Sequence, residues 1–219
     1  MHLLDELVFY THLLHNQGFV AATDGNVSVR TGTNSVLITR SGVPKREVKY
    51  TDFIEVDFSG RVLKGSGKIS TEHKLHFHIY RNRPEIKSVF HSHPVNITAA
   101  CSSRLNLDRP FFPEIILSIG RSPLCRYANP STDDLHLSLD PFINFANVFL
   151  LENHGLVTTG GSVKEAYYRT EKMEHYAKTV VAAVPAGGLN EIPGEKLSEL
   201  YNIADSTYGI KLHPKNRYL

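Results

Sequence analysis

Two histidines one residue apart, in the otherwise apolar run VFHSHPVN at residues 89–96, are of a type and spacing that could do chemistry. Side chains alternate between the two faces of a strand, so an extended segment places His91 and His93 on one face. A third histidine, His154, follows in ENHGL, where Gly155 permits a sharp turn. Three neutral imidazoles with an open fourth position are the ligand set of a catalytic zinc site. The pattern therefore predicts a metal site at His91, His93 and His154.

Two reservations about these histidines stay open. Imidazole binds other divalent metals as well, so zinc is a preference and not a deduction. The chain has 12 histidines, so two of them can fall close together by chance. By spacing alone, the H-x-H pair is a moderately specific signal.

Glu72, in the stretch ISTEHK, is the candidate general base. It lies at the start of a predicted helix, where a glutamate most often complements the helix dipole. The strand that carries His91 and His93 follows shortly after, so a helix–strand return could bring the carboxylate beside the metal. A carboxylate that is near a metal and shielded from water can transfer protons.

Small polar residues and glycines occur in three turns and offer hydroxyl and backbone N–H groups that suit a phosphate. Each turn alone is weak evidence, because turns commonly use such residues. The three pairs are Gly25-Asn26, Ser41-Gly42 and Ser70-Thr71.

The composition is that of an ordinary globular protein. The chain has 219 residues, of which 41% are hydrophobic and 21% charged, with a formal net charge of +2. This balance gives no nucleic-acid or anionic-membrane footprint. Two cysteines indicate a reduced, cytoplasmic protein, and no apolar run is long enough for a membrane span. The N-terminus carries early acidic residues and lacks the basic region of a signal peptide.

Strands and helices alternate along the chain without repeats or linkers before its last quarter, which predicts one α/β domain over residues 1–219. An amphipathic helix opens the chain, and Ser70 is expected to cap a helix that Pro84 ends. FIEVDFSGRVLKG is expected to form a hairpin that turns at Ser59-Gly60, and a Pro-rich loop, DRPFFPEIILSIGRSP, is expected to lead to the turn ANPSTDDLH. The clearest helix spans residues 162–184, where apolar residues recur every three or four positions. A final helix is expected at about 194–206, with a tail from about residue 209 that is expected to be mobile.

The motifs occur in one order, and that order resembles the class II aldolase/adducin family, with L-fuculose-1-phosphate aldolase the most similar type. The resemblance covers nearly the whole chain, and only the motifs taken together are specific. They are DGNVSVR, ITRSGVP, ISTEHKLHFHIYRNRPEI, VFHSHPVN, RYANPST, LLENHGLV, EAYYRTEKMEH and TYGIK.

The resemblance implies a fold of α/β/α layers around a mainly antiparallel mixed sheet. It also implies that the three histidines bind one zinc ion per subunit and that Glu72 is the acid/base, with Thr71 in place of a serine. Such enzymes are cytoplasmic homotetramers with active sites at subunit interfaces, which bind a small phosphorylated sugar and neither nucleic acid nor membrane. The implied phosphate site comprises Asn26, Ser41, Gly42, Ser70 and Thr71.

Two further residues are candidate proton donors on the aldehyde side. The C-terminal TYG matches a tyrosine that reaches the site in fuculose-phosphate aldolases, which points to Tyr208. The segment FFPEIIL lacks the tyrosine that those enzymes can supply from a neighbouring subunit, and it offers Glu114 instead. Glu114 could equally be a helix-start or surface charge.

The implied function is reversible cleavage, through an enediolate, of a phosphorylated ketose to dihydroxyacetone phosphate and a short aldehyde such as L-lactaldehyde. Ribulose-5-phosphate 4-epimerase and methylthioribulose-1-phosphate dehydratase are alternatives within the family, and a non-catalytic adducin-like module is a less favoured one. Other polar residues are expected to be structural. His73, His76 and His78 are interpreted as helix-surface or interface residues. Lys45, Arg46 and Lys49 are interpreted as a solvated charge cluster, one member of which could assist phosphate binding.

Overall fold

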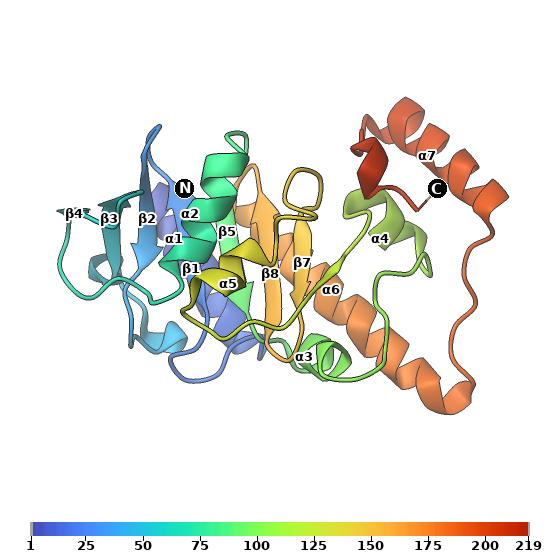
Figure 1. The fold of residues 1–219 in the computed structure, drawn as a ribbon, viewed down its shortest axis with the longest axis horizontal. Coiled ribbons are helices and arrows are strands. Elements are labelled where there is room, and N and C mark those ends of the chain that lie inside the picture. Colours follow the sequence, from blue (N-terminus) through green and yellow to red (C-terminus); the bar gives the residue numbers. More distant parts are fainter. Residues whose placement is uncertain (1, 219) are drawn as a thin grey trace.

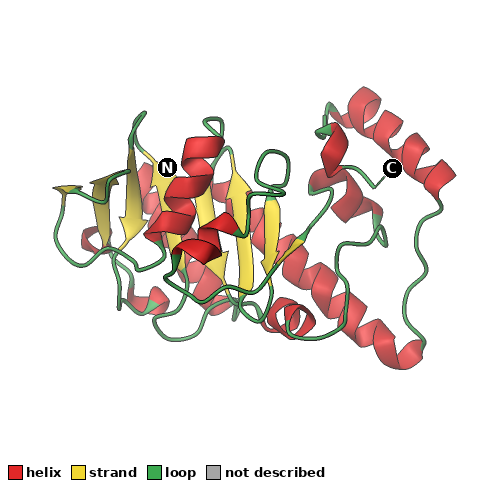
Figure 2. Cartoon of the chain, viewed as in Figure 1, coloured by secondary structure: helices red, strands yellow, loops and turns green. Residues whose placement is uncertain are grey.

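An eight-stranded mixed sheet forms the middle layer of the fold (Figure 2), and the computed structural model describes residues 2–218. The strand order is β4-β3-β2-β1-β5-β8-β7-β6, and neighbours run antiparallel except for the parallel pair β6 and β7. The strands are β1 (Asn26–Arg30), β2 (Ser35–Thr39), β3 (Phe53–Asp57), β4 (Val62–Lys64), β5 (Ser88–Ser92), β6 (Leu124–Cys125), β7 (Val148–Leu151) and β8 (Gly155–Gly160).

Helices cover both faces of this sheet, so the fold has the predicted α/β/α layers (Figure 1). Helices α2 (His73–Asn82) and α5 (Asp133–Leu137) pack on one face through a core that includes Leu75, Val89 and Leu135. Helices α1 (Leu3–Asn16) and α6 (Val163–Ala183) lie on the other face. The remaining helices are α3 (Val95–Cys101), α4 (Pro113–Ser118) and α7 (Gly194–Tyr208), with short 3-10 turns at Lys45–Glu47, Tyr50–Asp52, Val184–Ala186 and Pro214–Asn216.

Strand β5 lies in the interior of the sheet, between β1 and β8, and all five of its residues are buried. Its two faces belong to different cores, because Val89 packs on the α2 side and Phe90 on the α1 side. A strand that is covered on both faces favours a continuous apolar sequence. His91 therefore occupies a position where an apolar residue would be the default.

The predicted elements are largely confirmed, with three corrections. Helix α6 matches the range expected at 162–184, and the hairpin of β3 and β4 turns at Ser59-Gly60 as expected. Helix α2 begins at His73 with Glu72 as its N-cap residue, so the prediction that Ser70 caps it was wrong. The segments expected to be a Pro-rich loop and a turn contain α4 and α5, whose few residues are too short for a periodic signal.

The C-terminal region packs on the end of α4 rather than on the sheet. Leu197 and Tyr201 of α7 form a small apolar core with Ile116. Beyond α7, Asn216 is almost fully buried and donates from Nδ2 to the carbonyl of Ile119 at 2.8 Å. Mobility of the chain after residue 209 stays a prediction.

Both cysteines are free thiols and both are buried, Cys101 at the end of α3 and Cys125 in β6. Burial raises the pKa of each thiol to about 12. Within residues 2–218, no helix combines the length and apolar character needed to cross a membrane.

Candidate active site

Three imidazoles converge where β5 ends and β8 begins. His91 is the fourth residue of β5, His93 follows that strand, and His154 lies in the turn between β7 and β8. The Nε2 atoms of His91 and His93 are 3.0 Å apart, and the ligand atoms of all three rings lie within 4.8 Å of one another. The prediction that these histidines come together is therefore confirmed.

The tautomer of His91 is fixed by the sheet itself. Its Nδ1 lies 3.0 Å from the carbonyl oxygen of Leu156 on β8, and a carbonyl only accepts, so Nδ1 carries the hydrogen. Nε2 is left with its lone pair directed toward the other two rings. A backbone carbonyl that holds the second nitrogen of an imidazole is the usual support of a metal-ligating histidine.

The three rings are held in the neutral form that a metal requires. Burial is the main cause that lowers the pKa of each, to about 4 in the case of His93. In a tetrahedral zinc site with Zn–N bonds of about 2.0–2.1 Å, the nitrogens are about 3.3 Å apart. The donor types, the neutral charge and the spacing of these rings therefore fit one divalent ion held between them.

Gly155 is required for a different reason from the one its sequence context predicts. The left-handed conformation in this turn falls on Asn153, with φ of 53°, and not on the glycine. A Cβ on Gly155 would lie 2.6 Å from the carbonyl oxygen of Ser92 and 2.8 Å from Cδ2 of His93. The glycine thus permits β8 to approach the backbone and ring of a predicted metal ligand.

The carboxylate of Glu72 lies against this trio, at the N-terminal end of α2. One oxygen is 3.3 Å from Nε2 of His91 and the other is 3.4 Å from Nε2 of His154. Burial acts to raise the pKa of Glu72, but the neighbouring imidazoles, led by His91, and a hydrogen bond from Asn26 outweigh it, so the net pKa is lowered. The group is ionised at neutral pH and can accept a proton.

A cavity of about 440 Å³ opens beside Glu72 and contains every predicted phosphate residue. Gly25 has φ of 73° and brings the loop before β1 so close to β5 that a Cβ there would lie 2.7 Å from the carbonyl oxygen of His91. The lining comprises Thr23, Asp24, Gly25, Asn26, Arg40, Ser41, Gly42, Lys45, Ser70, Thr71, Glu72, His93, Pro130 and His154.

Two cations in this cavity were not predicted as site residues. Arg40 directly precedes Ser41-Gly42 and pairs with Asp52 at 2.7 Å. Lys45 is almost fully buried, and its Nζ donates to the carbonyls of Thr23 at 2.8 Å and Val43 at 3.0 Å. The signal for Arg40 was its position beside the Ser-Gly pair. Lys45 was concealed by its exposed neighbours in the cluster KREVK, and the interpretation of Lys45 as solvated was wrong.

His76 is a second position where the interpretation from sequence was wrong, because the side chain is fully buried and not at a surface. It lies between β1 and α2, within hydrogen-bonding distance of Asn26 and Ser28. The spacing of Glu72, His76 and Tyr80 by four residues places them on one helix face, which is the signal that could have identified it.

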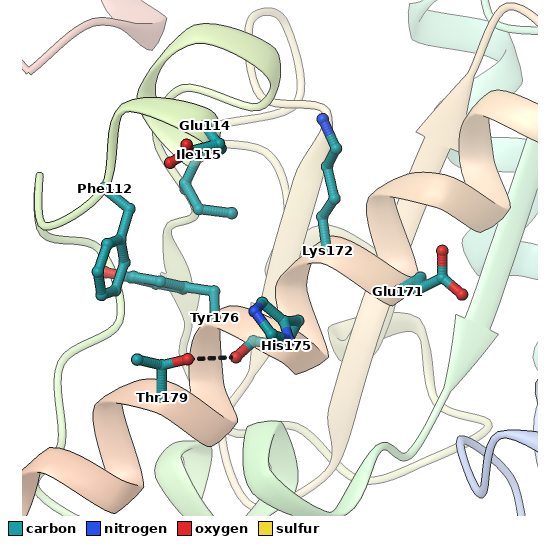
Figure 3. A pocket seen from close by; sticks show the side chains of 8 residues that line it. All are labelled: Phe112, Glu114, Ile115, Glu171, Lys172, His175, Tyr176 and Thr179. Carbon is teal, nitrogen blue, oxygen red and sulfur yellow. Dashed lines mark hydrogen bonds between the residues drawn. The ribbon is translucent and has the colours of Figure 1, made fainter.

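The two candidate proton donors lie away from this cavity in the single chain. Glu114 is an exposed residue of α4 and lines a separate cavity of about 660 Å³ together with Ile115, Lys172 and His175 (Figure 3). Tyr208 is the last residue of α7, with 63% of its surface exposed. Neither side chain lines the cavity beside Glu72 in the single chain.

Comparison with known proteins agrees with this geometry. The sequence profile of the class II aldolase and adducin N-terminal domain matches residues 5–181. An L-fuculose phosphate aldolase of Methanococcus vannielii is 32% identical over 179 residues, which cover 80% of this chain and 93% of the relative. A 3-oxo-tetronate 4-phosphate decarboxylase of Haemophilus influenzae is 31% identical over 168 residues, covering 75% of this chain and 80% of the relative.

A solved structure extends the likeness to the fold. The crystal structure of YgbL from Klebsiella pneumoniae, described as a putative aldolase/epimerase/decarboxylase, superposes with a TM-score of 0.84 at 28% identity and covers 90% of this chain and 97% of that chain. The profile match spans most of the sequence and includes the three histidines and Glu72. The chain therefore belongs to the class II aldolase and adducin family.

Proposed function

We propose that this chain is a zinc-dependent aldolase that reversibly cleaves a phosphorylated ketose, of the L-fuculose 1-phosphate type, to dihydroxyacetone phosphate and a short aldehyde. The observation that carries the proposal is the ionised Glu72 carboxylate, 3.3 Å from His91 and 3.4 Å from His154, at the wall of a cavity that suits a phosphate. An L-fuculose phosphate aldolase is among the relatives about one-third identical to this chain.

In this proposal, one group of cavity residues binds the substrate phosphate and Glu72 transfers the proton. The substrate phosphate is placed against the predicted phosphate residues, with the positive charges of Arg40 and Lys45 at the same wall. This placement holds the reacting carbons beside the three histidines. A zinc ion bound there supplies Lewis-acid stabilisation of the negative charge that develops on the substrate oxygens. Glu72 exchanges the proton at the carbon that becomes the hydroxymethyl group of dihydroxyacetone phosphate.

The proton at the aldehyde oxygen is assigned to Tyr208 or Glu114. Neither lines the cavity of its own chain. The proposal is therefore that a neighbouring subunit completes each site in a homotetramer, and that this enzyme is cytoplasmic. The assembly brings two different regions, the end of α7 and the start of α4, within range of the same substrate end.

A decarboxylase is the second candidate function, because relatives with this name are as similar as those named aldolase. Loss of carbon dioxide from a 3-oxo acid and cleavage of an aldol both leave an electron pair on a carbon next to a carbonyl. The same cation site and the same proton-transfer group would serve both reactions. The end of the substrate opposite the phosphate would differ.

A panel of substrates separates these functions. Purified protein is incubated with L-fuculose 1-phosphate, ribulose 5-phosphate, methylthioribulose 1-phosphate and 3-oxo-tetronate 4-phosphate. The measured products are dihydroxyacetone phosphate, aldehyde, carbon dioxide, the epimeric pentulose phosphate and the diketone phosphate formed by loss of water. The proposal expects dihydroxyacetone phosphate and aldehyde from the first compound. Carbon dioxide from the last compound alone would replace the aldolase with the decarboxylase.

Two controls test the site itself. Removal of metal with EDTA should abolish cleavage, and added zinc should restore it. Glu72→Gln should lower kcat by about 10² to 10⁴, the usual contribution of a positioned acid/base group. Bound zinc, measured by elemental analysis, should remain near one per chain in this variant. Full activity without metal, or no stoichiometric metal at all as in a non-catalytic adducin-like module, would contradict the proposal.

A further inference from the structure

A chain of buried hydrogen bonds runs from Glu72 into the interior between α2 and β1. Asn26 Nδ2 donates to a carboxylate oxygen of Glu72 at 2.8 Å, and Asn26 Oδ1 lies 2.5 Å from Nε2 of His76. Nδ1 of His76 lies 2.6 Å from the hydroxyl of Ser28, which is 2.8 Å from the hydroxyl of Tyr80. All of these side chains except Glu72 are at least 96% buried.

The donors and acceptors in this series of hydrogen bonds can be arranged in only one direction. Asn26 donates from Nδ2 to Glu72, so its amide oxygen faces His76. The oxygen must accept, so Nε2 of His76 carries the hydrogen and Nδ1 accepts from the hydroxyl of Ser28. The hydroxyl of Tyr80 then donates to Ser28. Every donor in this series, from Tyr80 through Ser28, His76 and Asn26, therefore points toward Glu72.

The direction of donation is maintained because the His76 ring is neutral at neutral pH. Burial is the main cause that lowers its pKa to about 3, and the nearby His91 and His73 lower it further against the opposing effect of Glu72. A neutral ring has one donor and one acceptor, and here both are used. The hydrogen-bonded groups between Tyr80 and Glu72 therefore form a set of dipoles with fixed orientation.

We propose that His76 is a positioning residue that acts through Asn26. In its Nε2–H form it fixes the amide of Asn26 with both N–H bonds toward the cavity. One N–H holds Glu72 beside His91 and His154. The other makes no hydrogen bond to protein within residues 2–218 and is directed to a phosphate oxygen of the substrate, a step that rests on the proposed function.

The opposite arrangement would disrupt both contacts. If His76 carried its hydrogen on Nδ1, Asn26 would turn its amide nitrogen to the ring and its oxygen to Glu72. Two acceptors would then face each other in a buried site, which is costly. Glu72 would move from the histidine trio, and the cavity would present an oxygen to the substrate phosphate.

An NMR experiment tests the tautomer without any substrate. Long-range ¹H–¹⁵N spectra of the ¹⁵N-labelled protein report which imidazole nitrogens carry hydrogen, and the His76 signals are assigned by their loss in His76→Gln. We expect a neutral Nε2–H ring between pH 6 and 8. An Nδ1–H ring or an imidazolium would overturn the proposal, whatever reaction the protein catalyses.

A matched pair of serine variants tests the effect on function. Ser28 and Ser88 lie on adjacent strands and both are fully buried. Among residues 2–218, the Ser88 hydroxyl bonds only to the backbone carbonyl of Ser28. We expect Ser28→Ala to lower kcat at least fivefold and to weaken binding of inorganic phosphate at least threefold, with bound zinc unchanged. Ser88→Ala should change both values by less than twofold.

Two substitutions at His76 complete the test. Gln keeps a donor near the position of Nε2, so His76→Gln should retain kcat and phosphate affinity better than His76→Leu by at least tenfold. Equal losses in the two serine variants, or equal losses in the two His76 variants, would show that only packing matters and would overturn the proposal. If the wild type cleaves no compound of the panel, the proposed function fails, while the NMR and phosphate-binding results still decide the role of His76.

Discussion

At the scale of single residues, the site combines rings that need space with a glycine that provides it. Gly155→Ala places a methyl group against the Ser92 carbonyl and the His93 ring, so we expect zinc affinity to fall at least about tenfold, as for other changes in the support of metal ligands. The measurement is a competition titration with a zinc chelator.

The matched control for this substitution is Gly194→Ala. Gly194 is the first residue of α7, and a methyl group added there would have no neighbouring atom within 4 Å, so zinc affinity should not change. Equal affinities for wild type and Gly155→Ala would contradict the close approach of β8 to the His93 ring.

Lys45 gives a prediction for the pH dependence of stability. Burial is the main cause that lowers its pKa in the folded protein to about 8, from 10.5 in an unperturbed lysine, and Asp24 opposes this effect. Between these values the unfolded chain binds a proton that the folded protein does not. The free energy of unfolding should therefore gain up to about 1.4 kcal/mol per pH unit from this group as pH rises from 8 to 10.5.

Urea unfolding of wild type and Lys45→Met at pH 7.5, 8.5 and 9.5 measures this contribution. The difference between wild type and variant should move in favour of the wild type as pH rises, because the variant has no proton to lose. Parallel pH profiles for the two proteins would contradict the buried position of Lys45.

The residues proposed to bind metal and transfer protons could be predicted from the sequence more readily than the buried residues that position them. His91, His93 and Glu72 are conspicuous because polar residues interrupt an apolar strand or begin a helix. Lys45 and His76 are polar residues that only tertiary packing buries, and neither is conspicuous among its neighbours. Sequence spacing indicates a helix face, but not whether that face meets a strand that carries Asn26 and Ser28.

At the scale of elements, a side chain from α6 holds the start of α3. Pro94 at the N-cap of α3 provides no side-chain acceptor. The carboxylate of Glu174 instead accepts the backbone N–H groups of Asn96 and Ile97, each at 3.0 Å, and the Asn96 amide at 2.7 Å. Free N–H groups in a first helical turn need such acceptors.

Glu174→Ala should therefore lower the free energy of unfolding by about 1–3 kcal/mol, the cost of leaving partly buried donors without acceptors. The control is Lys178→Ala, an exposed residue one turn later on α6 whose side chain makes no hydrogen bond or ion pair within residues 2–218, and there the change should stay within about 0.5 kcal/mol. Chemical denaturation measures both. Similar losses in the two variants would exclude a capping role for Glu174.

Long elements were predictable and short ones were not. The apolar stripe of α6 covers many turns, and the alternation of β3 and β4 around Ser59-Gly60 is a local signal. Strand β6 has two residues and α4 has six, so neither can show a period. Such pieces form because β7 and α7 provide partners for them.

At the scale of the whole molecule, the separation of Glu114 and Tyr208 from Glu72 predicts that activity depends on assembly. Glu72→Gln and Tyr208→Phe are each expected to be weakly active. When the two are mixed under subunit exchange, about a quarter of the sites should combine an intact Glu72 with an intact Tyr208, by random mixing in a symmetric oligomer.

Activity of the mixture should thus exceed the sum of the separate variants and approach about a quarter of the wild-type value. The control is a mixture of Glu72→Gln with Glu72→Ala, which can form no intact site. A mixture no more active than its components would place Tyr208 outside the site of a neighbouring subunit.

Both thiols lie in the interior with pKa values of about 12, so the folded chain presents almost no thiolate to an oxidant or alkylating reagent at neutral pH. Sulfur becomes reactive only in molecules that have opened. The rate at which an alkylating reagent labels Cys101 and Cys125 should therefore report how often the protein opens, without a cysteine having to be introduced.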